Sequence, residues 1–183
     1  RQHVVDARGR LDLRDQDLGP AEAKEVAAFL ATSAGGSVAH LALGSNPIGD
    51  EAMIPLLDTL KDIPLISFDI SNTNCGVSTA SKLAELLTDE TKIRRAVTSI
   101  NCLANKFGDD DLATLVAAIE GTSVRSLCGL TEGQTTADFS RQHLGPMDCK
   151  IIAAEYGFQG FIAAIAHLAL GSNPIGDEAM IPL

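Results

Sequence analysis

Hydrophobic and polar positions recur along this chain with one fixed spacing. Apolar residues occupy the first, third and eighth positions of a short frame, and a polar residue, most often asparagine or glutamine, occupies the sixth. Alternate side chains of a strand point to opposite faces, so the frame predicts a short strand with one apolar face, followed by a turn. The six frames start at Leu11, Leu41, Phe68, Ile100, Ala137 and Leu168.

A second spacing follows each frame. Apolar residues stand eight and twelve positions beyond the last residue of the frame, as at Val26 and Leu30 in the first unit and at Ile152 and Tyr156 in the fifth. An interval of four residues keeps side chains on one helical face. Every unit is therefore predicted to be a strand, a turn and a helix.

Proline positions refine the predicted helix starts. Pro20 and Pro146 each follow a glycine, and we expect helices to begin there because the first helical position needs no N–H. Pro55 and its counterpart Pro182 fall about one turn inside two other predicted helices, where a ring removes a hydrogen bond. For these two we expect an irregular first turn, or a regular helix that begins near residues 54 and 181.

Stacked units of this kind must curve. Neighbouring strands lie about 4.8 Å apart, whereas packed helices need about 8 to 10 Å between their axes. Parallel strands should therefore form a concave inner wall and helices a convex outer wall. The amides of Asn46, Asn105 and Asn173 are expected to satisfy backbone groups where the chain leaves the strand.

These units resemble leucine-rich repeats of the ribonuclease-inhibitor type. The best match within the chain is the run I-G-D-E-A-M from Ile48 to Met53, with Leu56 and Leu60 in the helix that follows. The family asparagine is replaced elsewhere by Gln16, Thr73 and Gln142. The resemblance implies an α/β solenoid in the form of a right-handed horseshoe arc. It also implies ligand recognition by a scaffold, as in inhibitor arrays and in the sensor halves of nucleotide-binding immune-type receptors.

The array contains one irregular stretch. The interval between the fourth and fifth frames, 37 residues, is the longest. Leu127 opens a strand-like segment, but Gly129 stands where its second apolar residue should be. We interpret residues 123–136 as an irregular insertion or an aborted strand within a single array that covers residues 1–183.

Two stretches of the chain, Ala39–Leu56 and Ala166–Leu183, are identical. A weaker similarity links the first unit to the fifth, which indicates a longer period of about four units. Terminal repeats usually carry a polar cap over the core, and neither end shows one. We expect a segment of a longer protein, or an engineered chain whose copied ends meet neighbouring molecules.

Charge and cysteine usage exclude several classes of partner. Lys and Arg number 14 against 24 Asp and Glu, and the net charge of −10 repels nucleic acid and anionic lipid. No apolar run is long enough to insert into a bilayer. The cysteines form no Cys-x-x-Cys pair, so we interpret them as core residues rather than metal or redox groups, and unpaired thiols favour an intracellular compartment. They are Cys75, Cys102, Cys128 and Cys149.

No motif predicts catalysis. The chain lacks the phosphate loop G-x-x-x-x-G-K-[ST] and the nucleophile motif G-x-S-x-G. The acidic run Asp109–Asp111 suggests a cation site, but at a helix start it is better placed to stabilise the positive end of the helix dipole. We therefore expect no enzyme activity, no cofactor and no metal.

The residues between the buried frame positions are assigned to the concave wall by alternation. His40 and His167 hold the same position in the identical stretches, either as polar residues of a solvated face or as a pH-sensitive contact. Ala42 and Ala169 belong to the same wall. The predicted partner-binding residues are Arg10, Asp12, Arg14, His40, Ser67, Asp69, Ser71, Ser99, Asn101, Asp138, Ser140 and His167.

Three functions are compatible with such a wall. The first hypothesis is a non-enzymatic scaffold that binds another protein through the concave face or the flank of the solenoid. The second is a structural spacer or assembly subunit whose copies associate end to end. The third follows from the resemblance alone and is a GTPase-activating regulatory array, since similar repeats act on the Ran GTPase.

Overall fold

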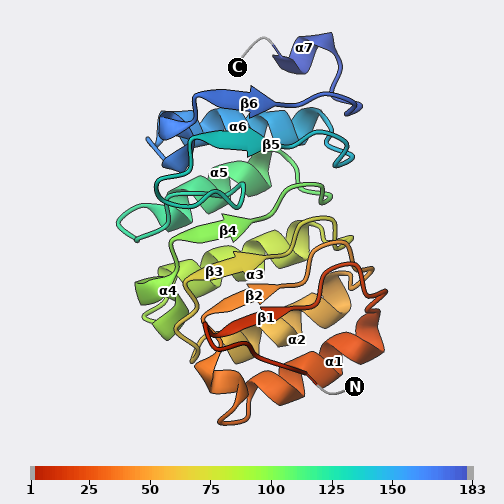
Figure 1. The fold of residues 1–183 in the computed structure, drawn as a ribbon, viewed down its shortest axis with the longest axis vertical. Helices are drawn as coiled ribbons and strands as arrows, with labels where there is room; N and C mark the ends of the chain where they lie inside the picture. The colour runs from red at the N-terminus through yellow and green to blue at the C-terminus, as the bar shows by residue number, and fades with distance from the viewer. Residues whose placement is uncertain (1–2, 181–183) are drawn as a thin grey trace.

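The molecule is a stack of layers, most of which contribute one strand to an inner wall and one helix to an outer wall (Figure 1). The computed structural model describes residues 3–180. The strands are β1 (Arg10–Asp12), β2 (His40–Ala42), β3 (Ser67–Asp69), β4 (Ser99–Asn101), β5 (Thr136–Asp138) and β6 (His167–Ala169). The α-helices are α1 (Pro20–Leu30), α2 (Asp50–Leu60), α3 (Val77–Thr88), α4 (Lys92–Ala96), α5 (Asp109–Ile119), α6 (Pro146–Gly157) and α7 (Asp177–Met180). Two short 3₁₀ helices are η1 (Gly35–Ser37) and η2 (Phe161–Ala164).

The strands pair in the predicted register. All pairs are parallel, and the first frame positions Leu41, Phe68 and Ile100 lie side by side on neighbouring strands. These side chains point toward the helices and are buried. The predicted α/β solenoid, with parallel strands on one wall and helices on the other, is confirmed.

The helices pack against one another in sequence, α1 on α2, α2 on α3, and α3 on α5. Pro20 and Pro146 stand at the first positions of α1 and α6, as predicted. Within residues 3–180 no helix is long and apolar enough to span a bilayer.

The prediction for Pro55 was wrong. Helix α2 begins at Asp50 and runs through Pro55 without interruption. Leu56, Leu57 and Leu60 are fully buried in this helix, whereas Pro55 is on its exposed face. Burial of the apolar face therefore outweighs the hydrogen bond that the ring removes. Pro182 and Ile181, for which the same irregularity was predicted, lie outside the described residues.

Replacing Pro55 by alanine is expected to raise the free energy of unfolding by about 1–2 kcal/mol. The helix gains a backbone hydrogen bond and loses a ring clash, and the greater freedom of the unfolded chain offsets part of that gain. Urea denaturation of both proteins measures the difference. The matched control is Pro20→Ala, at a first helical position where proline is favourable. A Pro55→Ala chain no more stable than the parent would contradict the assignment of Pro55 to the interior of a regular helix.

Helix α6 departs from the predicted pattern. Tyr156 was predicted to face the core, but it is 43% exposed, and Glu155 is buried at 0% exposure instead. The backbone of Gly160 packs so closely that a side chain there would meet Arg125 and Glu155. The last turn of α6 therefore buries a carboxylate where the other helices bury an aliphatic residue.

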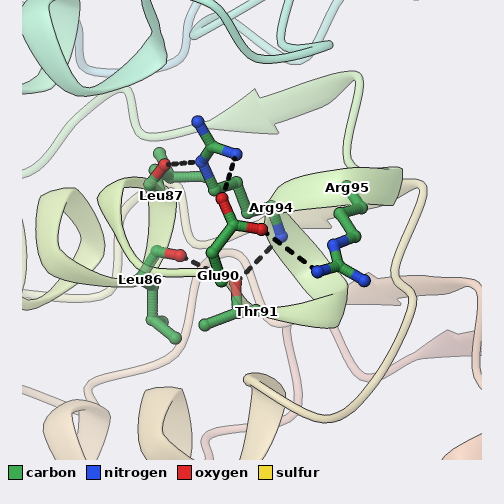
Figure 2. A network of polar contacts seen from close by, with 6 residues as sticks. All are labelled: Leu86, Leu87, Glu90, Thr91, Arg94 and Arg95. Atoms are coloured by element: carbon green, nitrogen blue, oxygen red, sulfur yellow. Dashed lines mark hydrogen bonds and ion pairs between the residues drawn. The ribbon is translucent and has the colours of Figure 1, made fainter.

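A small polar network closes the end of α3 (Figure 2). Arg94 Nε donates to the carbonyl of Leu87 at 2.8 Å, and the Thr91 hydroxyl donates to the carbonyl of Leu86 at 2.8 Å. Thr91 also accepts a hydrogen bond from the backbone amide of Arg94. These contacts satisfy the carbonyls that a helix end leaves unpaired, and they place α4 before the next strand.

Asparagine side chains join the layers in pairs. Asn46 Oδ1 accepts hydrogen bonds from the backbone amides of Gln16, at 3.1 Å, and Leu18, at 2.9 Å, in the preceding layer. Asn105 and Asn173 bind the layers before them in the same way. The role predicted for these three asparagines is confirmed.

The second and third layers are joined by a different residue, because Thr73 replaces the asparagine. Asp50 Oδ1 accepts hydrogen bonds from the backbone amides of Gly76, at 2.8 Å, and Thr79, at 3.2 Å. It also accepts one from the Thr79 hydroxyl. Asp50, at the start of α2, thus binds the third layer at the junction where no asparagine of the third layer binds the second.

The stack is interrupted between β4 and β5. Ser126 and Cys128 form isolated bridges with Ser99 and Asn101 of β4, so this segment adds a strand-like layer to the inner wall. It adds no helix before β5, and β5 and β6 form a separate two-stranded sheet. We call the junction between residues 3–130 and residues 136–180 the seam.

The four cysteines are buried and free, as predicted for core residues. Burial raises the pKa of the Cys102 thiol to about 12 and raises that of Cys128 well above its usual range. Thiol reagents attack the thiolate, so we expect all four cysteines to react only as fast as the chain unfolds. A colorimetric thiol assay with and without denaturant measures this. Fast reaction of the native chain would contradict the described burial.

Candidate functional site

The side chains that face away from the helices form three rows across β1–β4. In-register pairing places Arg10, His40, Ser67 and Ser99 in the first row. The second row holds Asp12, Ala42, Asp69 and Asn101. The third row follows each strand by two residues and includes Arg14, Gly44 and Ser71. Together the rows make a polar surface, which we call the inner wall.

The inner wall is hollowed at its centre. A hollow of about 190 Å³ is lined by residues of all four strands, with Ala42 between the charged residues of β1 and those of β3. Eight of the twelve predicted residues line it, namely Arg10, Asp12, Arg14, His40, Ser67, Asp69, Ser99 and Asn101. Ser71 is hydrogen-bonded to Asp69 at its edge.

One ion pair lies on the β1 side of the hollow. Arg14 donates to Asp12 through Nε at 2.9 Å and through Nη2 at 2.6 Å. The two bonds from the guanidinium hold the pKa of the Asp12 carboxyl below its usual value. Both side chains are largely exposed, so this pair orients charge on the wall and contributes little to stability.

A second carboxylate forms the β3 side. Asp69 Oδ1 accepts hydrogen bonds from the backbone amide of Ser71 at 2.9 Å and from its hydroxyl at 2.7 Å. Burial nevertheless raises the pKa of the Asp69 carboxyl. Gly44 lies beside this group, and a side chain there would come within 2.8 Å of Ser71 Oγ and 3.2 Å of Asp69. The glycine therefore leaves the space that the Asp69 carboxylate and the Ser71 hydroxyl occupy.

The histidine predicted at this wall contacts its neighbour on the next strand. His40 Nδ1 and Ser67 Oγ lie 2.8 Å apart, which fixes the ring over the sheet. The equivalent His167 is an exposed residue of β6. The two histidines therefore share a sequence position but not an environment.

Three predicted residues lie beyond the seam. Asp138 and Ser140 belong to the layer of β5, and His167 to β6, and none of them lines the hollow. The Ser140 hydrogen bonds hold the pKa of the exposed Asp138 carboxyl below its usual value. The structure thus divides the predicted set between two sheets.

Two residues of the hollow were missed by alternation, Gly129 and Thr131 of the interrupted segment. Gly129 has a φ of +78°, and a side chain there would come within 2.8 Å of Asn101 Cβ. The sequence did carry a signal, because Gly129 breaks the apolar frame. Its placement at the inner wall could not be read from the frame, however, since the frame ends there.

The acidic run at the start of α5 is used for capping, as predicted. Asp111 accepts a hydrogen bond from the backbone amide of Gly108 at 2.8 Å, and Asp109 forms an ion pair with Lys150 at 2.7 Å. Within residues 3–180, no three His, Cys, Asp or Glu side chains gather as a metal site would require. The arrangement of the inner wall can bind and orient polar groups.

Comparison with known proteins agrees with this architecture. A family model described as Leucine Rich repeat matches residues 37–57 and 165–183. These ranges are centred on the two identical stretches. The two matched segments are leucine-rich repeats, and the solenoid around them supports a leucine-rich repeat protein.

A curated relative extends the match beyond these two repeats. NACHT, LRR and PYD domains-containing protein 5 of Bos taurus is 28% identical over 169 residues, which cover 89% of this chain. The match covers 14% of the relative's own length. The leucine-rich repeats described above are therefore related to the repeat array of a much longer multidomain protein.

Proposed function

We propose that this leucine-rich repeat protein is a non-enzymatic module that binds another protein through its inner wall. The observation that carries the proposal is the hollow across β1–β4, where two carboxylates, two guanidinium groups and several hydroxyl groups line one space. Leucine-rich repeats serve protein–protein interaction, which supports the class of partner.

The inner wall is suited to recognition because its side chains are held in place. Arg14 is fixed by Asp12, His40 by Ser67, and Asp69 by Ser71. Groups oriented before binding lose less conformational freedom when a partner arrives. The partner should therefore present complementary polar groups on a convex surface.

Filling the hollow tests the proposal. Ala42→Arg places a long side chain between β1 and β3, and we expect it to weaken partner binding at least about tenfold by steric exclusion and charge mismatch. The matched control is Ala113→Arg on the exposed face of α5, which should leave binding unchanged. The partner is captured from cells that express the chain, purified, and titrated against all three proteins by calorimetry.

Two results would overturn this assignment. Equal affinity of the parent chain and Ala42→Arg would show that the hollow is not the contact surface. Loss of affinity in Ala113→Arg alone would place the contact on the helical wall instead.

A second candidate is end-to-end stacking of copies, and the identical stretches provide the observation. Leu41 and Leu43 are covered by the following layer, whereas their counterparts Leu168 and Leu170 are only half-buried. A layer of another molecule could cover them in the same way. X-ray scattering over a concentration series tests this, since stacking predicts growth along the long axis and a constant profile contradicts it.

A further inference from the structure

The seam lacks the backbone bonding that joins the other layers. Between β1 and β2, for example, a strand ladder is extended by bonds from Leu13 to Ala42 and from Asp15 to Gly44. Between the described residues up to 130 and those from 136 onward, one backbone hydrogen bond is present. It runs from the Phe161 amide to the Arg125 carbonyl at 2.7 Å.

The seam also differs from the rest of the array in how the strand spacing compares with the helix spacing. The segment around Ser126 adds a second strand spacing, about 4.8 Å, to the inner wall between β4 and β5. No helix is added between α5 and α6, whose axes need about 8 to 10 Å. The extra strand-like layer lengthens the inner wall without lengthening the outer wall, so the difference between the two walls is smaller at the seam, while one hydrophobic core continues across it.

Asp148 supplies an acceptor that a turn carbonyl supplies in other layers. In other layers a turn amide donates to a carbonyl of the next turn, as Asp15 does to Gly44 and Asn72 to Leu103. At the seam the equivalent amide, that of Ala104, donates to Asp148 Oδ1 at 2.7 Å. A side chain of α6 thus substitutes for a backbone contact.

Glu155 makes the second contact from α6. Its Oε2 accepts hydrogen bonds from the Ser126 hydroxyl at 3.0 Å and from the Leu127 amide at 3.1 Å. Its Oε1 accepts one from the Ile162 amide at 3.3 Å. The carboxylate therefore ties the last strand-like segment of the first block to η2 of the second.

We propose that the seam is a hinge. Residues 3–130 and residues 136–180 move as two bodies, and the side chains of Asp148, Glu155 and Lys150, the last through its ion pair with Asp109, hold them in the arrangement of Figure 1. The angle between the inner wall of β1–β4 and that of β5–β6 then adjusts to the shape of whatever the array contacts. The hinge is independent of which surface binds a partner.

Distances between spin labels test the hinge in the free protein. The native cysteines are buried, so introduced cysteines can be labelled selectively. The pair Ala28→Cys and Ala117→Cys, on exposed positions of α1 and α5, reports on one block. The pair Ala28→Cys and Tyr156→Cys, on α1 and α6, spans the seam. Pulsed electron paramagnetic resonance should give a distribution about twofold wider across the seam than within the block.

Weakening the α6 contacts should widen the distribution across the seam further, because an amide replaces one acceptor oxygen with a donor nitrogen. Asp148→Asn and Glu155→Gln are the isosteric variants, and Glu85→Gln, on an exposed position of α3, is the control. The within-block distribution should stay unchanged in all three variants. A seam-spanning distribution as narrow as the within-block one would overturn the hinge. Because this comparison uses the parent chain, it tests the hinge even where a variant does not fold.

Discussion

Replacing Asn46 by alanine is expected to lower the free energy of unfolding by about 3 kcal/mol or more. Asn46 is 1% exposed and joins two layers through one side chain. Its removal leaves the buried amide of Leu18 and the buried carbonyl of Leu13 without their partner. Each buried polar group left unpaired costs about 1–3 kcal/mol, and the loss falls on a junction between repeats.

Urea denaturation followed by circular dichroism measures this effect. The matched control is Asn74→Gly, at an exposed turn residue with a φ of +60° that glycine adopts freely. We expect the control to change stability by less than about 0.5 kcal/mol. An Asn46→Ala chain as stable as the control would show that the asparagine contacts do not hold the layers together.

Replacing Glu155 by alanine is expected to lower the free energy of unfolding by about 2–4 kcal/mol, which is the second large effect. The substitution leaves the Ser126 hydroxyl and the amides of Leu127 and Ile162 unpaired inside the molecule, and it opens a small cavity. The isosteric Glu155→Gln keeps the volume and should lose less. Thermal and urea denaturation of the three proteins give the ranking.

The pH dependence of this effect has a definite sign. Burial raises the pKa of the Glu155 carboxyl, so the folded chain holds this proton more tightly than the unfolded chain does. The contribution of Glu155 to the free energy of unfolding is complete below its pKa in the unfolded chain, about 4.3. It declines as pH rises through the pKa of Glu155 in the folded chain. The stability of the parent chain relative to Glu155→Gln should therefore be greatest at low pH. A difference that grows with rising pH would contradict this account.

The strands and the inner wall could be predicted because both depend on a local repeat. The spacing of Leu41, Phe68 and Ile100 within their frames is enough to place them on neighbouring strands. Alternation then placed Asp12 and Asp69 on the opposite face, where the structure has them. No long-range information was needed for either inference.

The seam could not be predicted, because its contacts join residues far apart where the frame fails. Asp148 binds the amide of Ala104, 44 residues away, and Glu155 binds Ser126, 29 residues away. The regular spacing instead placed Tyr156 in the core of α6. A buried carboxylate is acceptable there only because the interrupted segment supplies its hydrogen-bond donors.

Pro55 also shows that the local sequence does not determine every element of the structure. Local propensity predicted an irregular helix start, since proline removes a hydrogen bond inside a helix. The packing of Met53, Leu56 and Leu60 against neighbouring layers keeps α2 regular in spite of it. Burial of the apolar face of α2 therefore outweighed the local preference of Pro55.

Hydrogen–deuterium exchange of the chain, with and without its captured partner, tests the central claim most directly. Binding through the inner wall predicts that amides near β1, β2 and β3 become protected, while exposed segments of α1, α2 and α5 do not change. Protection confined to the helices, with the strand amides unchanged, would contradict the assignment of the inner wall as the binding surface.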